Sequence, residues 1–160
     1  LIPFEVDGEN QQSDGEQKLT ERLSVNEKGL HRLVGLRVLV AEDNKVNRDI
    51  IGIQLKTLGC SFEFAENGRI ALEKAMKEDY DMILMDVMMP EMDGIEATMA
   101  IRKAELDMGR RIPIVALTAG TMKTDIERCL GAGMDDHTSK PIRRDALISV
   151  MLKYSEGTKT

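Results

Sequence analysis

Short apolar runs alternate along the chain with longer segments whose apolar residues recur at helical spacing. The apolar runs cover Leu36–Ala41, Ser61–Ala65, Met82–Met85 and Ile114–Leu117, and a shorter one lies near His137–Ser139. Runs this short, rich in aliphatic and β-branched residues, are typical of strands that are buried on both faces of a parallel sheet. The pattern therefore predicts five strands.

A helix is predicted after each of these strands. The expected helices cover Lys45–Leu58, Gly68–Lys77, Gly94–Lys103, Thr121–Leu130 and Arg143–Lys153, with a polar connection over Ala104–Arg111. Asn44 is a suitable N-cap for the first helix and Gly59 ends it, whereas Gly131 and Gly133 close the fourth. Strands that alternate with helices in this way predict an α/β fold with an open, doubly wound parallel sheet.

The segments outside this pattern are predicted to be a linker and a tail. Residues 1–35 are polar, lack a sustained hydrophobic period and carry more acidic than basic side chains. Such a segment buries too little apolar area to offset the entropy of ordering it, so we expect a flexible linker there. A folded domain is expected over 36–154, followed by a short tail over 155–160. Because the chain begins at Leu1 rather than Met, we expect it to be a piece of a longer protein.

Composition and charge narrow the classes of function. The 160 residues carry a net charge of -6, which argues against a nucleic-acid surface. The two cysteines, Cys60 and Cys129, cannot build a disulfide framework, which favours a reducing cytoplasm. No run approaches the roughly 20 apolar residues that span a bilayer, so we expect no direct membrane contact by this domain. A membrane anchor elsewhere in the parent protein stays open.

Polar side chains follow the predicted strands at the point where each strand ends. Glu42 and Asp43 follow the first strand, Asp86 the third, Thr118 the fourth and Lys140 the fifth. The carboxyl ends of parallel strands meet at one edge of the sheet, and ligands of such folds bind there, where the strand order reverses. We therefore expect three carboxylates, a hydroxyl and an ammonium group to lie together.

This set of groups predicts a magnesium and phosphate chemistry. Three crowded carboxylates repel one another unless they are protonated or bind a cation. Hard oxygen ligands without His or Cys suit Mg²⁺ rather than Zn²⁺, and Mg²⁺ commonly completes its shell with phosphate oxygens. A carboxylate in that setting can act as a nucleophile and become an aspartyl phosphate.

The same residues resemble the receiver domain of two-component response regulators. The motifs that carry the resemblance are Val38-Leu39-Val40-Ala41-Glu42-Asp43-Asn44, Met85-Asp86-Val87-Met88-Met89-Pro90-Glu91-Met92-Asp93-Gly94, Ala116-Leu117-Thr118-Ala119 and Ser139-Lys140-Pro141. The resemblance covers about Leu36–Leu152. It implies a flavodoxin-like fold, a five-stranded parallel sheet in the order 2-1-3-4-5 with five helices.

The resemblance assigns roles to the acidic residues. It implies that Asp86 is the phosphoacceptor and a ligand of Mg²⁺, for which Mn²⁺ can substitute. Asp43 and the backbone carbonyl of Met88 would be further metal ligands, and Glu42 would complete the acidic pair, directly or through water. A receiver catalyses its own phosphorylation and dephosphorylation, which leaves open whether the domain counts as an enzyme.

The phosphate-binding and switch residues follow from the same resemblance. Lys140 would bind the phosphoryl group, with a cis bond to Pro141, and Thr118 would be the switch hydroxyl. The family usually has an aromatic residue three positions before the lysine, and His137 takes that place in this chain. A switching role for His137 and a plain surface histidine are both open.

A docking surface for a partner is predicted on the first helix. Val46, Ile50, Ile53 and Leu58 fit a buried stripe of this helix. Ile51 and Leu55 form a second ridge. This ridge either widens the core face or docks a histidine-bearing helical bundle, as partners do in the family.

The motif wording resembles receivers fused to hybrid sensor histidine kinases, so the expected partner is a histidine kinase or a histidine phosphotransfer domain. Two other functions compete. A haloacid-dehalogenase-type hydrolase needs a second Asp two residues after the nucleophile, where this chain has Met88. A binding module that works without phosphorylation typically lacks an acidic residue or the lysine, and this chain has both.

Overall fold

The structure is a computed structural model that describes residues 29–120 and 122–155. The chain divides into two units, Leu1–Arg32 and Leu33–Thr160, and the fold below is that of the second. The linker predicted over 1–35 lies outside the described residues except for 29–35, and the predicted tail except for Ser155. Among the described helices, none is long and apolar enough to cross a membrane.

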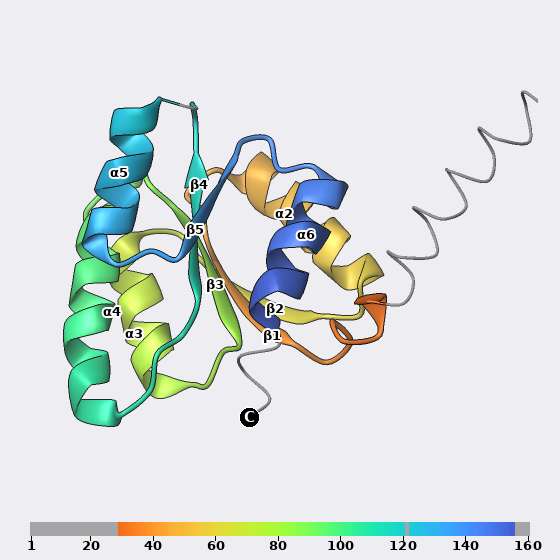
Figure 1. Ribbon diagram of the computed structural model, residues 1–160, viewed down its shortest axis with the longest axis horizontal. Coiled ribbons are helices and arrows are strands. Elements are labelled where there is room, and N and C mark those ends of the chain that lie inside the picture. The colour runs from red at the N-terminus through yellow and green to blue at the C-terminus, as the bar shows by residue number, and fades with distance from the viewer. Residues whose placement is uncertain (1–28, 121, 156–160) are drawn as a thin grey trace, which may run out of the picture. The chain divides into compact units, whose positions relative to one another are not determined.

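Five parallel strands form one sheet in the order β2-β1-β3-β4-β5 (Figure 1). The strands are β1 (Arg37–Ala41), β2 (Ser61–Ala65), β3 (Met82–Asp86), β4 (Ile114–Thr118) and β5 (Asp136–Ser139). Every residue of β3 and β4 is buried, because helices cover both faces of these central strands. The predicted fold class and strand order are confirmed.

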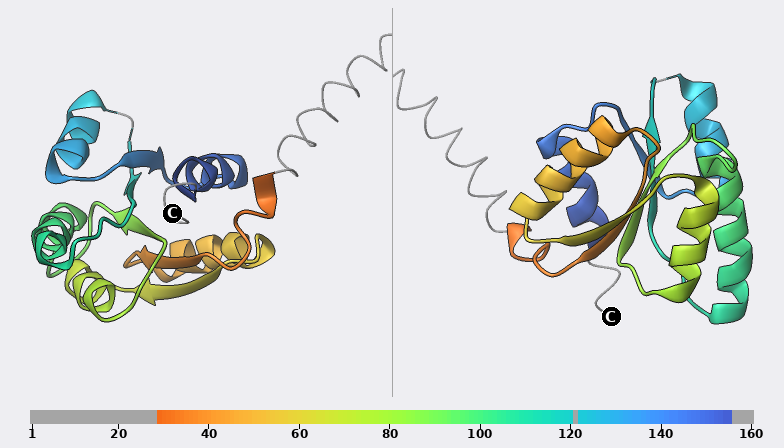
Figure 2. Two further views of the ribbon diagram at one scale, coloured as in Figure 1. Left: turned by 60° about the horizontal axis from the view of Figure 1, so that its bottom comes forward. Right: turned by 180° about the vertical axis from the view of Figure 1, so that it is seen from behind.

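Five helices follow the strands. They are α2 (Lys45–Thr57), α3 (Gly68–Lys77), α4 (Gly94–Met108), α5 (Lys123–Ala132) and α6 (Arg144–Ser155). Helices α2 and α6 cover one face of the sheet, and α3, α4 and α5 cover the other (Figures 1 and 2). Asn44, Asn67 and Asp93 cap the first three of these helices, each side chain accepting a backbone N–H three residues on.

Helix α4 is longer than the sequence predicted, because it continues through Glu105 to Met108. Glu105 is buried, its carboxylate accepting bonds from Arg102 Nη1 at 2.6 Å and from the Ile112 backbone N–H at 2.5 Å. The polar connection predicted over Ala104–Arg111 is therefore mostly helix. Some polar residues of this segment are exposed to water, whereas Glu105 belongs to a buried ion pair. A hydropathy pattern does not distinguish these two cases.

Helix α5 is also displaced from its predicted span. It begins at Lys123 and continues through Gly131 to Ala132, so Gly131 lies inside the helix. Gly133 ends it with a φ of 112°, a left-handed conformation that favours glycine. Only one of the two expected glycine stops is used.

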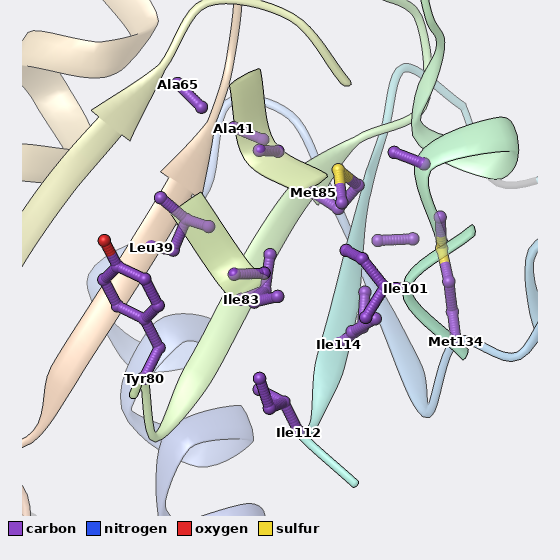
Figure 3. Packing of buried hydrophobic residues seen from close by; sticks show 14 of the residues in the cluster. Leu39, Ala41, Ala65, Tyr80, Ile83, Met85, Ile101, Ile112, Ile114 and Met134 are labelled. Atoms are coloured by element: carbon purple, nitrogen blue, oxygen red, sulfur yellow. The ribbon is translucent and has the colours of Figure 1, made fainter. Parts of the chain in front are cut away.

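One face of the sheet forms a core with α3, α4 and α5 (Figure 3). Leu39, Ile83 and Ile114 come from three adjacent strands and belong to the same buried cluster as Ile101 of α4. Small residues of the covering helices, such as Ala75, let the helix backbones approach the sheet closely. This packing fixes the height of the helices relative to the strand ends and so shapes the rim at which the strands terminate.

On the other face, α2 is rotated relative to the prediction. Ile51 and Leu55 are 3% and 0% exposed, whereas Val46 and Ile53 are both 65% exposed. Both sets of residues recur at helical spacing, so periodicity alone does not choose between them. The side of α2 that faces the sheet is the one that carries Gly52. The helix approaches the sheet so closely there that a Cβ at Gly52 would lie only 3.1 Å from ring atoms of Phe62 and Phe64.

The prediction that Ile51 and Leu55 dock a partner is therefore wrong, since both are part of the core. The prediction that Val46, Ile50 and Ile53 are buried is wrong for the same reason. Leu58, the fourth residue of the predicted stripe, is buried as expected. Leu33, which the sequence places in the linker, is fully buried and its carbonyl accepts a hydrogen bond from the Cys60 thiol at 3.3 Å.

Candidate metal and phosphoryl site

The ends of β1 and β3 bring three carboxylates together. Glu42 and Asp43 directly follow β1, and Asp86 is the last residue of β3, its neighbour in the sheet. Carboxylate oxygens of these three residues all lie within 4.8 Å of one another. Glu42 and Asp86 are buried, whereas Asp43 is exposed. Two carboxylates of the cluster are thus shielded from solvent, and the third is open to water.

Backbone contacts fix the loop that carries the acidic pair. The Glu42 N–H donates to the Ala65 carbonyl of β2 at 2.9 Å, and the Asn44 N–H donates to Glu42 Oε1 at 3.1 Å. Arg48, a residue that the sequence analysis did not single out, donates from Nη1 to the carbonyls of Glu42 at 3.0 Å and Asp43 at 3.1 Å. The sequence offers one sign of this role, because Arg48 lies in the first turn of a helix, where an acidic residue is favoured over a basic one.

Lys140 directly follows β5, and its side chain reaches the cluster along the edge at which the strands end. Its Nζ lies 2.8 Å from Asp86 Oδ1 and 3.4 Å from Glu42 Oε2. Its backbone N–H donates to the Thr118 carbonyl at 2.8 Å, which ties the loop after β5 to the end of β4. The bond from Lys140 to Pro141 is cis, as predicted.

Asp86 is held closely but not fully paired. Its Oδ1 accepts the Met88 N–H at 3.2 Å in addition to the Lys140 contact. Its Oδ2 is buried and has no hydrogen-bond partner among the described residues. Gly94 packs against the Asp86 backbone so closely that a Cβ would lie 2.1 Å from the Asp86 carbonyl oxygen.

The electrostatics of the cluster reflect an excess of negative charge in a desolvated place. Burial raises the pKa of Asp86 to about 7, and the charge of Glu42 adds to this rise, while Lys140 opposes it. Burial alone would lower the pKa of Lys140, but its contacts with Asp86 and Glu42 outweigh burial and raise that pKa. The contact with Lys140 therefore does not cancel the rise in the pKa of Asp86 that burial causes.

The residues present fit a hard divalent cation. The cluster offers only carboxylate oxygens, two of which, Glu42 Oε2 and Asp86 Oδ2, are buried without a hydrogen-bond partner, and the open side at Asp43 leaves room for water ligands. These are the ligands that Mg²⁺ prefers, whereas Zn²⁺ sites are usually built with His or Cys. The peptide unit of Met88 adjoins the same carboxylate, because its N–H already contacts Asp86.

Thr118 lies at the next strand end. It is buried, and its hydroxyl donates to the Thr138 carbonyl over a long 3.4 Å. A cavity of about 120 Å³ opens beside it, lined in part by Val87, Met88, Gly120 and Arg128. The hydroxyl-bearing residue thus lines a cavity that begins one residue after Asp86, at Val87.

His137 lies farther along the sheet, on β5, where it pairs in register with Ala116 and is half-buried. Its backbone N–H donates to Asp136 Oδ1 at 2.8 Å. The structure thus brings Glu42, Asp43, Asp86 and Lys140 together, with Thr118 beside them. A switching role for His137 stays a prediction.

One family model and several known proteins are similar to this chain. A family model described as "Response regulator receiver domain" matches residues 38–152. "Histidine kinase 1" of Arabidopsis thaliana is 32% identical over 91% of this chain and 15% of its own length. "Hybrid signal transduction histidine kinase G" of Dictyostelium discoideum is 42% identical over 77% of this chain and 4% of its own length. The chain thus spans only a small part of these relatives.

Two solved structures show the same fold. One is the receiver domain of the sensor histidine kinase PA1611 from Pseudomonas aeruginosa PAO1, with a magnesium ion coordinated in its active site cleft. It has 40% identity and a TM-score of 0.71, covering 77% of this chain and 99% of that one. The other comes from the co-crystal structure of the Saccharomyces cerevisiae histidine phosphotransfer signaling protein Ypd1 and the receiver domain of Ssk1. It has 32% identity and a TM-score of 0.72, covering 76% and 90%.

Proposed function

This chain belongs to the response regulator receiver domain family, and on that premise we propose that Asp86 accepts a phosphoryl group, with Mg²⁺, from a phosphohistidine in a two-component phosphorelay. The observation that carries this proposal is the buried, unpartnered Oδ2 of Asp86. A buried carboxylate oxygen without a partner is costly. Glu42 Oε2 also lacks a hydrogen bond, but it lies 3.4 Å from Lys140 Nζ, so Asp86 Oδ2 is the oxygen most ready to bind a metal ion or to form a new bond.

Asp43, Asp86 and the backbone carbonyl of Met88 would hold Mg²⁺ directly, and Glu42 would contribute directly or through water. When bound, the ion neutralises the charge on the phosphoryl oxygens. Support comes from the acidic cluster and from the magnesium ion in the cleft of the Pseudomonas receiver. Mn²⁺ is expected to substitute, because it takes the same oxygen ligands.

The chain's own residues would complete the transfer. An Asp86 oxygen forms the bond to phosphorus while the N–P bond of the donor breaks and its electron pair returns to the imidazole nitrogen. Lys140, now 2.8 Å from Asp86 Oδ1, would pair with a phosphoryl oxygen. The Thr118 hydroxyl gives up only a long bond to Thr138 when it turns toward the phosphoryl group, which suits a switch residue.

The docking surface that replaces the predicted one lies on the outer side of α2. Val46, Ile50 and Ile53, here called the α2 patch, are exposed apolar side chains in a row at helical spacing. Ile50 also lines a pocket with Lys140 and Pro141, so the patch continues to the edge of the site. A histidine phosphotransfer bundle is the proposed occupant. The Ssk1 receiver, crystallised with such a protein, supports that choice.

Substitution on the α2 patch tests this docking surface. Changing Val46 and Ile53 to Glu should slow transfer from a phosphohistidine partner at least tenfold, while loading by acetyl phosphate stays unchanged. Met99→Glu on α4, at a side chain 58% exposed, is the matched control. Equal transfer rates for the patch variant and the control would remove the docking proposal and leave the acceptor proposal intact.

We infer in addition that the parent protein is a hybrid histidine kinase, because the relatives that match are histidine kinases. The chain covers too little of those relatives to carry their activity itself. In such a parent the domain would take its phosphoryl group from a kinase or histidine phosphotransfer domain, in a reducing cytoplasm.

Intact-mass analysis after treatment with acetyl phosphate tests the acceptor proposal. The wild type should gain one phosphoryl group when Mg²⁺ is present and none with EDTA. Asp86→Asn should gain none, whereas Asp93→Asn, at the N-cap of α4, should be loaded like the wild type. No gain by a folded wild type, with acetyl phosphate and with a phosphohistidine donor alike, would favour a binding module that works without phosphorylation.

A further inference from the structure

Arg48 occupies an unusual place in the first full turn of α2. Its side chain is only 14% exposed and turns back past the start of its own helix. There its Nη1 contacts both carbonyl oxygens of the acidic pair, those of Glu42 and Asp43. Its Nη2 lies 4.0 Å from Glu66, whose side chain is 72% exposed.

Helix stability does not explain this placement. The N-terminal end of a helix carries a partial positive charge, so a cation there is unfavourable. The first turn of α2 contains no acidic residue that would offset Arg48. The ion pair with Glu66 is long and solvated, and exposed pairs of this kind contribute little. The two hydrogen bonds to the loop carbonyls are therefore the main interactions that stabilise the buried position of this side chain.

These bonds act on the peptide units that orient the acidic side chains. Glu42 is anchored on one side by its N–H bond to Ala65, and Asn44 caps α2 on the other side. Between them, the carbonyls of Glu42 and Asp43 are held by a single guanidinium nitrogen. Without Arg48 both carbonyls lose a charged donor, and the peptide between Asp43 and Asn44 keeps only the 3.1 Å bond from its N–H to Glu42 Oε1.

We propose that Arg48 is a positioning residue for the metal site: it holds the Glu42–Asp43 backbone so that both carboxylates face the cation together with Asp86. This inference rests on the proposed Mg²⁺ site. Removing a partner that orients metal ligands typically costs 10- to 100-fold in metal affinity. We expect a loss of about 10-fold, because Asp86 itself is untouched.

The sign of the effect separates positioning from simple charge. Arg48 is a cation beside an acidic cluster, and its charge alone repels Mg²⁺. If charge were its only influence, Arg48→Met would bind Mg²⁺ more tightly than the wild type. The positioning role predicts the opposite, weaker binding, so the two explanations cannot both fit one result.

The experiment is a calorimetric titration of the metal-free protein with Mg²⁺. Arg48→Met should raise the Kd about 10-fold, and Arg48→Lys, which keeps the charge but not the reach, should fall between it and the wild type. Arg69→Met is the control, because Arg69 makes an exposed ion pair with Glu73 on α3. At saturating Mg²⁺, the loading rate of Arg48→Met should return to that of the wild type.

Urea denaturation and amide NMR spectra of the metal-free proteins accompany the titration. Shifts confined to Asp43 and its neighbours in Arg48→Met, with a native spectrum elsewhere, would support the inference. A Kd for Arg48→Met equal to or below that of the wild type would overturn it. So would equal affinities of Arg48→Lys and the wild type if Arg48→Met fails to fold. A wild type that binds no Mg²⁺ would instead overturn the proposed function and this inference together.

Discussion

Replacing Asp86 by Asn should stabilise the metal-free domain at neutral and alkaline pH, although it removes the proposed acceptor. The two side chains have nearly the same shape, so the change removes charge and little else. Asp86 is 1% exposed, close to Glu42, and has Lys140 as its cationic partner. The wild type therefore carries a buried charge that only a bound cation fully offsets.

The magnitude follows from the pKa of Asp86. Folding raises that pKa from 3.8 to about 7, which linkage converts into about 4 kcal/mol of destabilisation above pH 7. A group whose pKa is raised by folding contributes stability below its unfolded value, and this contribution is lost as pH rises through the folded value. The gain in Asp86→Asn is smaller than the full figure, because Lys140 loses an attraction, and we expect about 1–3 kcal/mol.

Urea unfolding with EDTA, at about pH 8 and about pH 5, measures this effect. The variant should exceed the wild type at the higher pH, and the difference should shrink by more than half at the lower pH, where folded Asp86 is protonated. Asp43→Asn, at an exposed carboxylate of the same cluster, should change stability by less than about 0.5 kcal/mol. A wild type more stable than Asp86→Asn at about pH 8 without metal would show that the buried charge of Asp86 does not destabilise the fold.

Three further predictions concern the close packing at Gly94, the buried ion pair of α4 and the binding of Mg²⁺. Gly94→Ala should destabilise the domain by at least about 3 kcal/mol and slow loading in urea and mass assays, because its Cβ would lie 2.1 Å from the Asp86 carbonyl oxygen, whereas Gly120→Ala, in open space, should be neutral in stability. Arg102→Met should cost about 3–5 kcal/mol in urea unfolding, since it leaves the buried Glu105 without its 2.6 Å ion-pair partner, and Glu105→Met should restore part of the loss. Adding Mg²⁺ should raise the thermal midpoint of the wild type and leave that of Asp86→Asn nearly unchanged.

The sheet could be predicted from the sequence because its signals are local and mutually consistent. Short aliphatic runs that end in polar residues specify buried strands, and caps such as Asn44 mark the helix starts. Once the strands are assigned, their ends are known, and the proximity of Glu42, Asp43 and Asp86 can be predicted from them. Asp86 is far from Glu42 and Asp43 in the chain, but parallel topology places the ends of their strands at the same edge of the sheet.

The errors lie where tertiary contacts decide between patterns of equal local quality. On α2 two apolar stripes were possible, and the close approach at Gly52 selects the one that contains Ile51 and Leu55. On α4 the buried Glu105 looks polar in the sequence, because its ion pair with Arg102 is invisible there. The contacts of Arg48 with the carbonyls of Glu42 and Asp43 likewise involve backbone atoms, and the unfavourable place of a cation in the first turn of α2 is the only sign of them in the sequence.

Chemical trapping tests whether Asp86 is the Mg²⁺-dependent phosphoacceptor. Borohydride reduces an aspartyl phosphate to homoserine, which peptide mass spectrometry locates by position. After loading with Mg²⁺ we expect homoserine at residue 86 alone, and none when EDTA is present. Homoserine at Asp43 or another carboxylate, or at residue 86 regardless of Mg²⁺, would contradict this expectation.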